Sequence, residues 1–283
     1  MRTSNALLFG GFPEPSSDIE AAVAEVRSLE ALGYDLVGVQ DHPYLDRYAD
    51  TFLLLAILAR ETDRVRLVTD VANLPLRPPA MLAKAASTLD LASGGRFELG
   101  LGAGASWDAV AAMGGPRRTP REAFEALEEA IQILRLLWSS DQAVSFSGAH
   151  YRISGVHPGP RPAHDIGLWI GGYGDRMMRL IGARADGWLP SSPYLGPEAM
   201  PAKLAILDEA LERAGRPREA VRRIYNVVGR FERTDDGFLH GSAERWIDDL
   251  GRLVDEGVDG FILWARDPDQ AARFASEVVP ALR

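Results

Sequence analysis

The sequence predicts a closed barrel of eight parallel β-strands surrounded by α-helices, a (β/α)8 or TIM barrel. Short apolar runs typical of strands alternate with amphipathic helical stretches along the whole chain of 283 residues. The alternation gives eight strand–helix units, and a barrel of this kind takes about 250 residues. We therefore expect one α/β domain, residues 1–283, with an insertion at about residues 139–165. An open, doubly wound sheet shows the same alternation and is the alternative fold.

The first unit begins with an expected strand at residues 5–10, whose sequence is NALLFG. A helix is expected at residues 19–32, because apolar residues recur there at helical spacing. Ser17 and Asp18 offer an N-cap for this helix. Gly33 ends it, as glycine often does just past a helix C-terminus.

The next three units follow the same pattern. Their expected strands and helices are residues 36–40 with 50–60, 65–69 with 79–92, and 96–101 with 120–138. Prolines open the helix at residues 79–92, in positions that the start of a helix tolerates.

The alternation of strands and helices is interrupted after the fourth helix and then resumes. Val144 and Phe146, with Tyr151 and Ile153, flank a Ser-Gly-Ala turn, which predicts a short β-hairpin inserted in the series. A Pro/Gly-rich connection follows at residues 157–162. The last four units are then expected at residues 168–171 with 176–185, 187–190 with 197–214, 221–229 with 242–256, and 259–264 with 268–282.

Composition excludes several classes of function. The absence of cysteine removes disulfides, thiolate metal sites and cysteine nucleophiles. A net charge of -9 gives no electrostatic reason to expect a nucleic-acid or anionic-membrane partner. No metal is expected, because the spacing of the remaining histidines suits no metal site. These histidines are His150, His157, His164 and His240.

No stretch of the sequence has the pattern of a targeting or membrane segment. The longest apolar run, residues 52–59, is far shorter than the roughly 20 residues of a bilayer span. Residues 1–12 are too short and too rich in Gly and Pro for a signal peptide. We therefore expect a cytoplasmic protein. Its richness in Ala and its scarcity of Lys are typical of a high-GC, bacterial genome.

Glycine-rich loops follow the fourth and fifth expected strands, at the strand ends where barrels gather ligand groups. The loop at residues 100–104 has glycine at every second position. It departs from the dinucleotide pattern at Trp107, and no clear helix is expected directly after it. Its glycines either let loops pack over the barrel mouth or let the backbone approach a flat ring or its phosphate tail. Residues 171–174 link a strand directly to a helix, whose free N–H groups could bind an anion; a tight turn is the alternative.

Asp41 and His42, after the second strand, are the candidates for proton chemistry. A histidine with a pKa near neutrality can donate or accept a proton close to a reacting centre. In the alternative, Asp41 accepts hydrogen bonds from loop N–H groups and His42 stacks on the adjacent helix. Asp70 lies at the end of the third strand. A partly buried carboxylate there needs hydrogen bonds, so its role is either functional or structural.

Together these motifs resemble the luciferase-like monooxygenase superfamily, whose barrel enzymes use reduced flavin or the deazaflavin coenzyme F420. The resemblance covers nearly the whole chain. Its most specific segments are residues 34–43 (YDLVGVQDHP), 74–104 (LPLRPPAMLAKAASTLDLASGGRFELGLGAG) and 169–190 (WIGGYGDRMMRLIGARADGWLP). The combination is specific for the superfamily and much less specific for the reaction.

The resemblance implies a role for each strand-end motif. Asp41 and His42 would lie near the reactive ring, with His42, oriented by Asp41, as the acid or base. The bond between Asp70 and Val71 would be a non-prolyl cis peptide behind the ring. The residues that border the ring and its polyol chain would be Gly102, Ala103, Gly104 and Ala105. The phosphate would be held by Gly171, Gly172, Tyr173 and Gly174.

Three positions depart from patterns within the superfamily. Deazaflavin-dependent sugar-phosphate dehydrogenases carry an acidic residue just after the glycine-rich loop and a Trp shortly after the His. Ala105 and Asp46 occupy those places here, which weakens a sugar-phosphate assignment. Bacterial luciferases place an Arg in the fourth-strand loop to meet the flavin phosphate. Ala103 occupies that place, which weakens a luciferase-type FMN mode.

We therefore expect an F420-dependent oxidoreductase that transfers a hydride between C5 of the deazaflavin and a small organic substrate. Phe12, Trp107 and Trp264 could line the substrate side. The alternatives are a monooxygenase that uses reduced FMN and O2, a non-catalytic flavin-binding barrel, and an open α/β sheet that binds a nicotinamide cofactor through residues 100–104. A homodimer through the helices after the second and third strands would also fit the resemblance.

Overall fold

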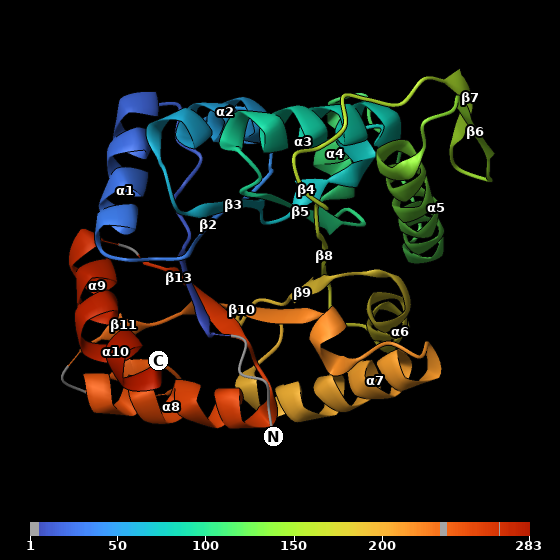
Figure 1. Cartoon of the computed structure of the whole chain (residues 1–283). Coiled ribbons are helices and arrows are strands. Elements are labelled where there is room, and N and C mark those ends of the chain that lie inside the picture. Colours follow the sequence, from blue (N-terminus) through green and yellow to red (C-terminus); the bar gives the residue numbers. More distant parts are fainter. Residues whose placement is uncertain (1–5, 233–236, 266) are drawn as a thin grey trace.

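The computed structural model describes residues 6–232, 237–265 and 267–283. Within these residues eight parallel strands close into a barrel, because β1 pairs with both β2 and β13 and β3 pairs with β5 (Figure 1). The barrel strands are β1 (Leu8–Gly11), β2 (Leu36–Val39), β3 (Arg66–Thr69), β5 (Phe97–Gly102), β8 (Leu168–Gly171), β9 (Gly187–Leu189), β10 (Arg222–Val228) and β13 (Gly260–Trp264). The predicted (β/α)8 barrel is confirmed, and the open sheet is wrong.

Helices form a layer around the barrel, as Figure 1 shows. They are α1 (Ile19–Ala31), α2 (Thr51–Glu61), α3 (Pro79–Ser93), α5 (Pro120–Ser139), α6 (Asp175–Arg184), α7 (Met200–Arg213), α8 (Ala243–Glu256), α9 (Pro268–Arg273) and α10 (Val279–Leu282). Asp18 caps α1 as predicted, since its side chain accepts the N–H of Ala21. The last helix expected from the sequence is divided, because a π-helical turn at Phe274–Val278 separates α9 from α10.

Some short elements were not expected from the sequence. The expectation that no helix follows the loop at residues 100–104 was wrong, because α4 (Trp107–Ala112) begins there. Val110 is the one buried residue of α4, so the helix leaves almost no apolar periodicity in the sequence. The strands β4 (Ala72–Asn73), β11 (Arg230–Phe231) and β12 (His240–Gly241) are two residues long, too short to produce a pattern. The expected first strand begins later, at β1, and its Asn5 is outside the described residues.

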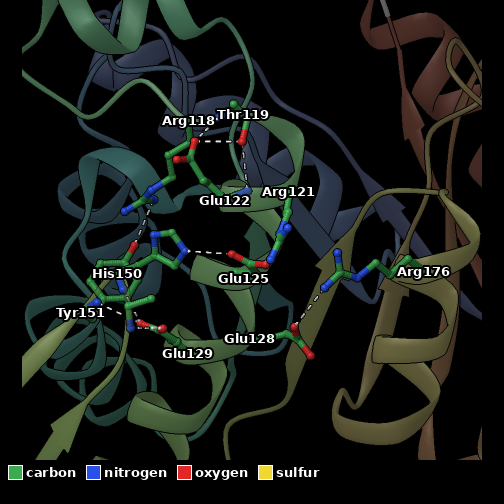
Figure 2. A network of polar contacts seen from close by, with 11 residues as sticks. Arg118, Thr119, Arg121, Glu122, Glu125, Glu128, Glu129, His150, Tyr151 and Arg176 are labelled. Carbon is green, nitrogen blue, oxygen red and sulfur yellow. Dashed lines mark hydrogen bonds and ion pairs between the residues drawn. The ribbon is translucent and has the colours of Figure 1, made fainter.

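The predicted hairpin is present as the antiparallel pair β6 (Val144–Ser147) and β7 (Arg152–Val156). It lies beside α5, outside the layer of helices (Figure 1). Glu129 of α5 fastens its turn, because the carboxylate accepts the backbone N–H groups of Ala149, His150 and Tyr151 at 2.6, 3.0 and 2.9 Å (Figure 2). The hairpin is therefore packed as an extension of α5.

The barrel interior changes from apolar to polar toward the C-terminal ends of the strands. Its apolar layer consists of Leu36, Val68, Trp169, Leu189, Ile224 and Ile262. Because side chains alternate along a strand, the next inward position after Val68 is Asp70, and the next after Ile224 is Asn226. The alternation therefore places two polar side chains above the apolar layer. Among the described residues, no helix combines the length and apolarity needed to cross a bilayer.

Candidate active site at the barrel mouth

A cavity of about 1110 Å³ opens at the C-terminal ends of the barrel strands. Its lining includes every residue for which the sequence predicted a catalytic or cofactor-binding role. These are Asp41, His42, Asp70, Val71, Gly102, Ala103, Gly104, Ala105, Gly171, Gly172, Tyr173 and Gly174. Phe12 and Trp264 also line it, with ring centroids 5.6 Å apart, whereas Trp107 is not among the lining residues. The structure thus brings the predicted residues together, while their individual roles stay predictions.

Asp41 is buried and holds two strand ends together. Its Oδ2 accepts the N–H of Asn73 at 2.9 Å and Nε of Arg77 at 2.6 Å, and its Oδ1 accepts Nη2 of Arg77 at 2.8 Å. Burial opposes the charge of Arg77, but its hydrogen bonds with Asp41 and Asp50 outweigh burial and raise its pKa. Both oxygens of Asp41 are occupied in this way, so its influence on His42 is through charge.

His42 lies half-buried beside this ion pair. Its ring stacks on Tyr44, with centroids 5.5 Å apart and planes 17° apart. Burial lowers the pKa of His42 below its ordinary value, although the charge of Asp41 opposes the shift. The imidazole is therefore mainly neutral at pH 7, the form that accepts a proton.

The Asp70–Val71 peptide bond is cis, as the resemblance implied. The side chain of Val71 lies against two of the predicted glycines. A Cβ at Gly102 would come 2.8 Å from Cγ2 of Val71, and a Cβ at Gly171 would come 3.2 Å from it. Glycine at both positions therefore accommodates Val71, which fills the space between the loops.

Asp70 lies on the floor of the cavity and is almost fully buried. Its Oδ1 accepts Nδ2 of Asn226 at 2.9 Å, and the same amide nitrogen lies 3.1 Å from Oγ of Ser191. Burial raises the pKa of the Asp70 carboxyl to about 7, against the effect of the hydrogen bond from Asn226. Sequence reasoning missed Asn226 and Ser191, although an Asn within the apolar run 224–228 was a usable signal.

The loop at residues 171–174 leads into α6, whose first turn faces the cavity. Gly174 is the N-cap, with no side-chain hydrogen bond to the helix, and a Cβ there would meet nothing within 4 Å. Gly172 has φ +128° and its carbonyl accepts Nε1 of Trp188 at 2.7 Å, which fixes the loop. Lys203 lies 2.7 Å from the carboxylate of Asp175 and offsets its charge. The open N-terminus of α6 can therefore accept an anion.

Two arginines line the cavity, Arg121 from the first turn of α5 and Arg176 from the first turn of α6, and Figure 2 shows both side chains. The guanidinium of Arg176 lies 3.8 Å from the ring centroid of Phe124, and Nε of Arg121 donates to Glu125 at 2.7 Å. Each is paired with a glutamate of α5, Arg121 with Glu125 and Arg176 with Glu128 at 3.7 Å, so the two pairs add little net charge near the N-terminus of α6. Within the described part of the chain, no group of three or more His, Asp or Glu side chains could hold a metal ion.

Comparison with known proteins gives matches over nearly the whole chain. The model of the luciferase-like monooxygenase family matches residues 4–236. A protein from Intrasporangium calvum named F420-dependent glucose-6-phosphate dehydrogenase is 28% identical, over 90% of this chain and 92% of its own length. A protein of the same name from Nakamurella multipartita is 32% identical, over 71% of this chain and 60% of its own length.

Solved structures with the same fold are more distant in sequence. An F420-dependent secondary alcohol dehydrogenase, in complex with an F420–acetone adduct, has a TM-score of 0.85 at 20% identity and covers 98% of this chain and 99% of its own. A riboflavin lyase, with modified FMN and riboflavin, has a TM-score of 0.84 at 14% identity and covers 99% of this chain and 92% of its own. These likenesses establish the fold.

Proposed function

The chain belongs to the luciferase-like monooxygenase family and is an oxidoreductase, and we propose that it uses coenzyme F420 to transfer a hydride to or from a small organic substrate. Several relatives in sequence are named F420-dependent enzymes, which supports this cofactor. The observation that carries the proposal is the joint placement of His42, the Asp70–Val71 segment and the open N-terminus of α6 around one cavity.

The residues present fit a ring cofactor with an anionic tail. Val71 offers an apolar surface between Gly102 and Gly171, on which a flat ring can rest. The first-turn N–H groups of α6, after Gly174, are placed to bind a phosphate. Buried oxygens on the cavity floor lack partners among the described residues, as expected where a ligand supplies hydrogen bonds. When bound, the deazaflavin supplies the hydride-transferring carbon C5.

His42 supplies the proton step. In the oxidation of an alcohol, its neutral imidazole accepts the hydroxyl proton; in the reverse direction, its protonated form donates one. Asp41 and Arg77 position the segment that carries His42, because their ion pair ties the end of β2 to the segment after β4. Asp41 is therefore a positioning residue that also stabilises the protonated imidazole through its charge.

The substrate side is apolar and aromatic, since Phe12 and Trp264 face the cavity together. Ala105 and Asp46 stand where the sugar-phosphate dehydrogenases of this family carry an acid and a Trp. Ala105 lines the cavity and offers no charge or hydrogen bond to a sugar. We therefore propose a small, largely apolar alcohol or carbonyl compound as the substrate, in place of a sugar phosphate.

Side-by-side fluorescence titration with F420 and FMN, each oxidised and reduced, tests the cofactor. Tight and selective binding of F420 is expected. Preference for reduced FMN, with oxygen consumption in the presence of substrate, would move the assignment to an FMN-dependent monooxygenase, the second candidate, which the family as a whole includes. Binding of cofactor without turnover of any alcohol or carbonyl compound would indicate a non-catalytic barrel.

We also propose a homodimer through α2 and α3. Leu53 and Ile57 lie one turn apart on α2 and are exposed, as are Met81 and Leu91 on α3. Exposed large apolar side chains on neighbouring helices are typical of an interface. Leu53→Glu is expected to convert the dimer into a monomer, measured by light scattering; an unchanged mass would contradict this contact.

A further inference from the structure

The floor of the cavity carries buried oxygens that have no hydrogen-bond partner. Among the described residues, the buried side-chain oxygens without a partner are Oδ2 of Asp70, Oδ1 of Asn73 and Oδ1 of Asn226. All three side chains line the same cavity. A buried oxygen without a partner has lost its hydrogen bonds to water, so a ligand that supplies hydrogen bonds there gains affinity.

Asp70 and Asn226 are joined across the barrel. They extend from β3 and β10, which lie opposite each other in the ring of strands. The bond from Nδ2 of Asn226 to Oδ1 of Asp70 therefore spans the mouth above Val68 and Ile224. A flat ligand that enters the barrel mouth meets this pair before it meets the apolar layer.

The two free oxygens of the pair differ in chemistry. Oδ1 of Asp70 already accepts a hydrogen bond, so the proton of the neutral carboxyl resides on Oδ2. Oδ2 is then a donor, whereas the amide oxygen of Asn226 is an acceptor. Burial raises the pKa of Asp70 to about 7, so the neutral form is present at and below neutral pH. The floor thus presents a donor beside an acceptor.

From this arrangement we infer that Asp70 and Asn226 recognise the carbonyl and N–H edge of the pyrimidinedione ring of the cofactor, Asp70 donating to a carbonyl oxygen and Asn226 accepting from the ring N–H. The inference rests on the proposed function for the presence of a ring cofactor. Flavins and deazaflavins share this edge, so the inference holds for FMN and for F420.

Other titratable groups face the same cavity and must be separated from Asp70. They are Asp41, His42, Tyr44, Arg47, Tyr48, Arg121, Tyr173, Arg176 and Tyr194. On β2, which packs against Asp70, Gly38 is its neighbour, and Asp41 is neutralised by Arg77 farther along. The apolar Ile262 of β13 also lies near Gly38 and Asp70. Burial lowers the pKa of His42 below its ordinary value, opposite to the shift of Asp70, and each pH series is repeated in a His42→Gln background to remove the titration of His42.

The first test measures the dissociation constants of F420 and FMN by fluorescence from pH 6 to 8.5. In the wild type, the dissociation constant should rise about 10- to 30-fold as Asp70 ionises, because only the neutral form binds. Asp70→Asn keeps an N–H donor of the same shape and should remove most of this rise. Asp46→Asn, an exposed carboxylate outside the cavity lining, is the matched control and should keep it. Equal pH profiles for the wild type and Asp70→Asn would overturn the inference.

The second test uses FMN methylated at the ring nitrogen between the two carbonyls, which lacks the N–H. The wild type should bind it at least about tenfold more weakly than FMN, a loss of the size of one hydrogen bond. Asn226→Ser should bind the two ligands nearly equally. Equal affinity of the wild type for both would overturn the role of Asn226. Failure of both F420 and FMN to bind at all would instead overturn the proposed function together with this inference.

Discussion

The buried side-chain oxygens at the two ends of the barrel differ in whether they have hydrogen-bond partners. At the N-terminal end, Glu98 accepts Nη1 of Arg66 and the N–H of Gly167, both at 2.7 Å, and Asp90 accepts the N–H and the ring of His164 at 3.0 and 2.8 Å. At the C-terminal end, Asp70 and two asparagines keep one oxygen each without a partner in the described chain. Paired oxygens stabilise the fold, whereas unpaired ones leave hydrogen-bonding capacity for a ligand.

The largest expected effect is a loss of stability when Arg96, at the N-terminal end of the barrel, is replaced. Its guanidinium donates to the backbone carbonyls of Ala59, Thr62, Val65 and Ser93 at 2.7–2.9 Å. Arg96→Met removes all of these hydrogen bonds and should lower the free energy of unfolding by about 3–5 kcal/mol. Denaturant unfolding measures this loss.

The same variant also tests whether the N-terminal end of the barrel takes part in cofactor binding. At a temperature where Arg96→Met is folded, its affinity for the cofactor should equal that of the wild type. Arg27→Met is the matched control, because Arg27 forms an exposed pair with Glu61; it should cost at most about 1 kcal/mol. A large loss of affinity in folded Arg96→Met would contradict the view that the N-terminal end stabilises the fold and takes no part in cofactor binding.

At the C-terminal end, Asp70→Asn should stabilise the cofactor-free protein, and more so at higher pH. Burial raises the pKa of Asp70 from 3.8 to about 7, so between these values the folded protein binds one more proton than the unfolded chain. The free energy of unfolding of the wild type therefore falls as the pH rises through this window, by at most about 4 kcal/mol in total. Thermal unfolding at pH 5 and pH 8.5 should show a larger advantage of the variant at pH 8.5. An advantage independent of pH would contradict the buried, neutral carboxyl.

His42→Ala should affect turnover much more than stability. If His42 transfers the proton as proposed, its loss should lower the rate at least about 100-fold. In the oxidative direction the wild-type rate should fall at acid pH, because the imidazole must be neutral; since burial lowers the pKa of His42, the fall should begin below pH 6.5. Near-normal turnover by the variant, measured under saturating cofactor, would exclude His42 as the acid or base.

The same difference between the ends explains how much of the molecule could be predicted from its sequence. Strands and helices were predictable because each buries an apolar face with a regular period, as in α5, whose buried residues recur at helical spacing. The cis bond at Asp70–Val71 leaves no periodic signal, and the resemblance to a known family alone implied it. Short α4, with only Val110 buried, left no pattern either.

Site residues that are neighbours in the sequence could be predicted to lie together. Contacts between residues on strands far apart in the sequence could not. Asp41 and His42 are adjacent in sequence, so their placement at one strand end could be inferred. The partner of Asp70 is Asn226, 156 residues away, and no local pattern connects them. The ion pair of Asp41 with Arg77 was missed for the same reason. Only closure of the barrel brings these side chains together.

The smallest effect expected at the C-terminal end concerns Lys203, which offsets the charge of Asp175 in the first turn of α6. Lys203→Met exposes a phosphate at this helix N-terminus to the uncompensated carboxylate. Affinity for F420 or FMN should fall about two- to fivefold, equivalent to about 0.4–1 kcal/mol, and the difference should shrink at high salt. Adding Asp175→Asn should restore affinity. Lys84→Met is the matched control, since Lys84 donates to the carbonyl of Gly159 and does not line the cavity. If both lysine variants bind like the wild type at low salt, the phosphate does not lie at α6, and the contribution of this end to binding comes from its floor alone.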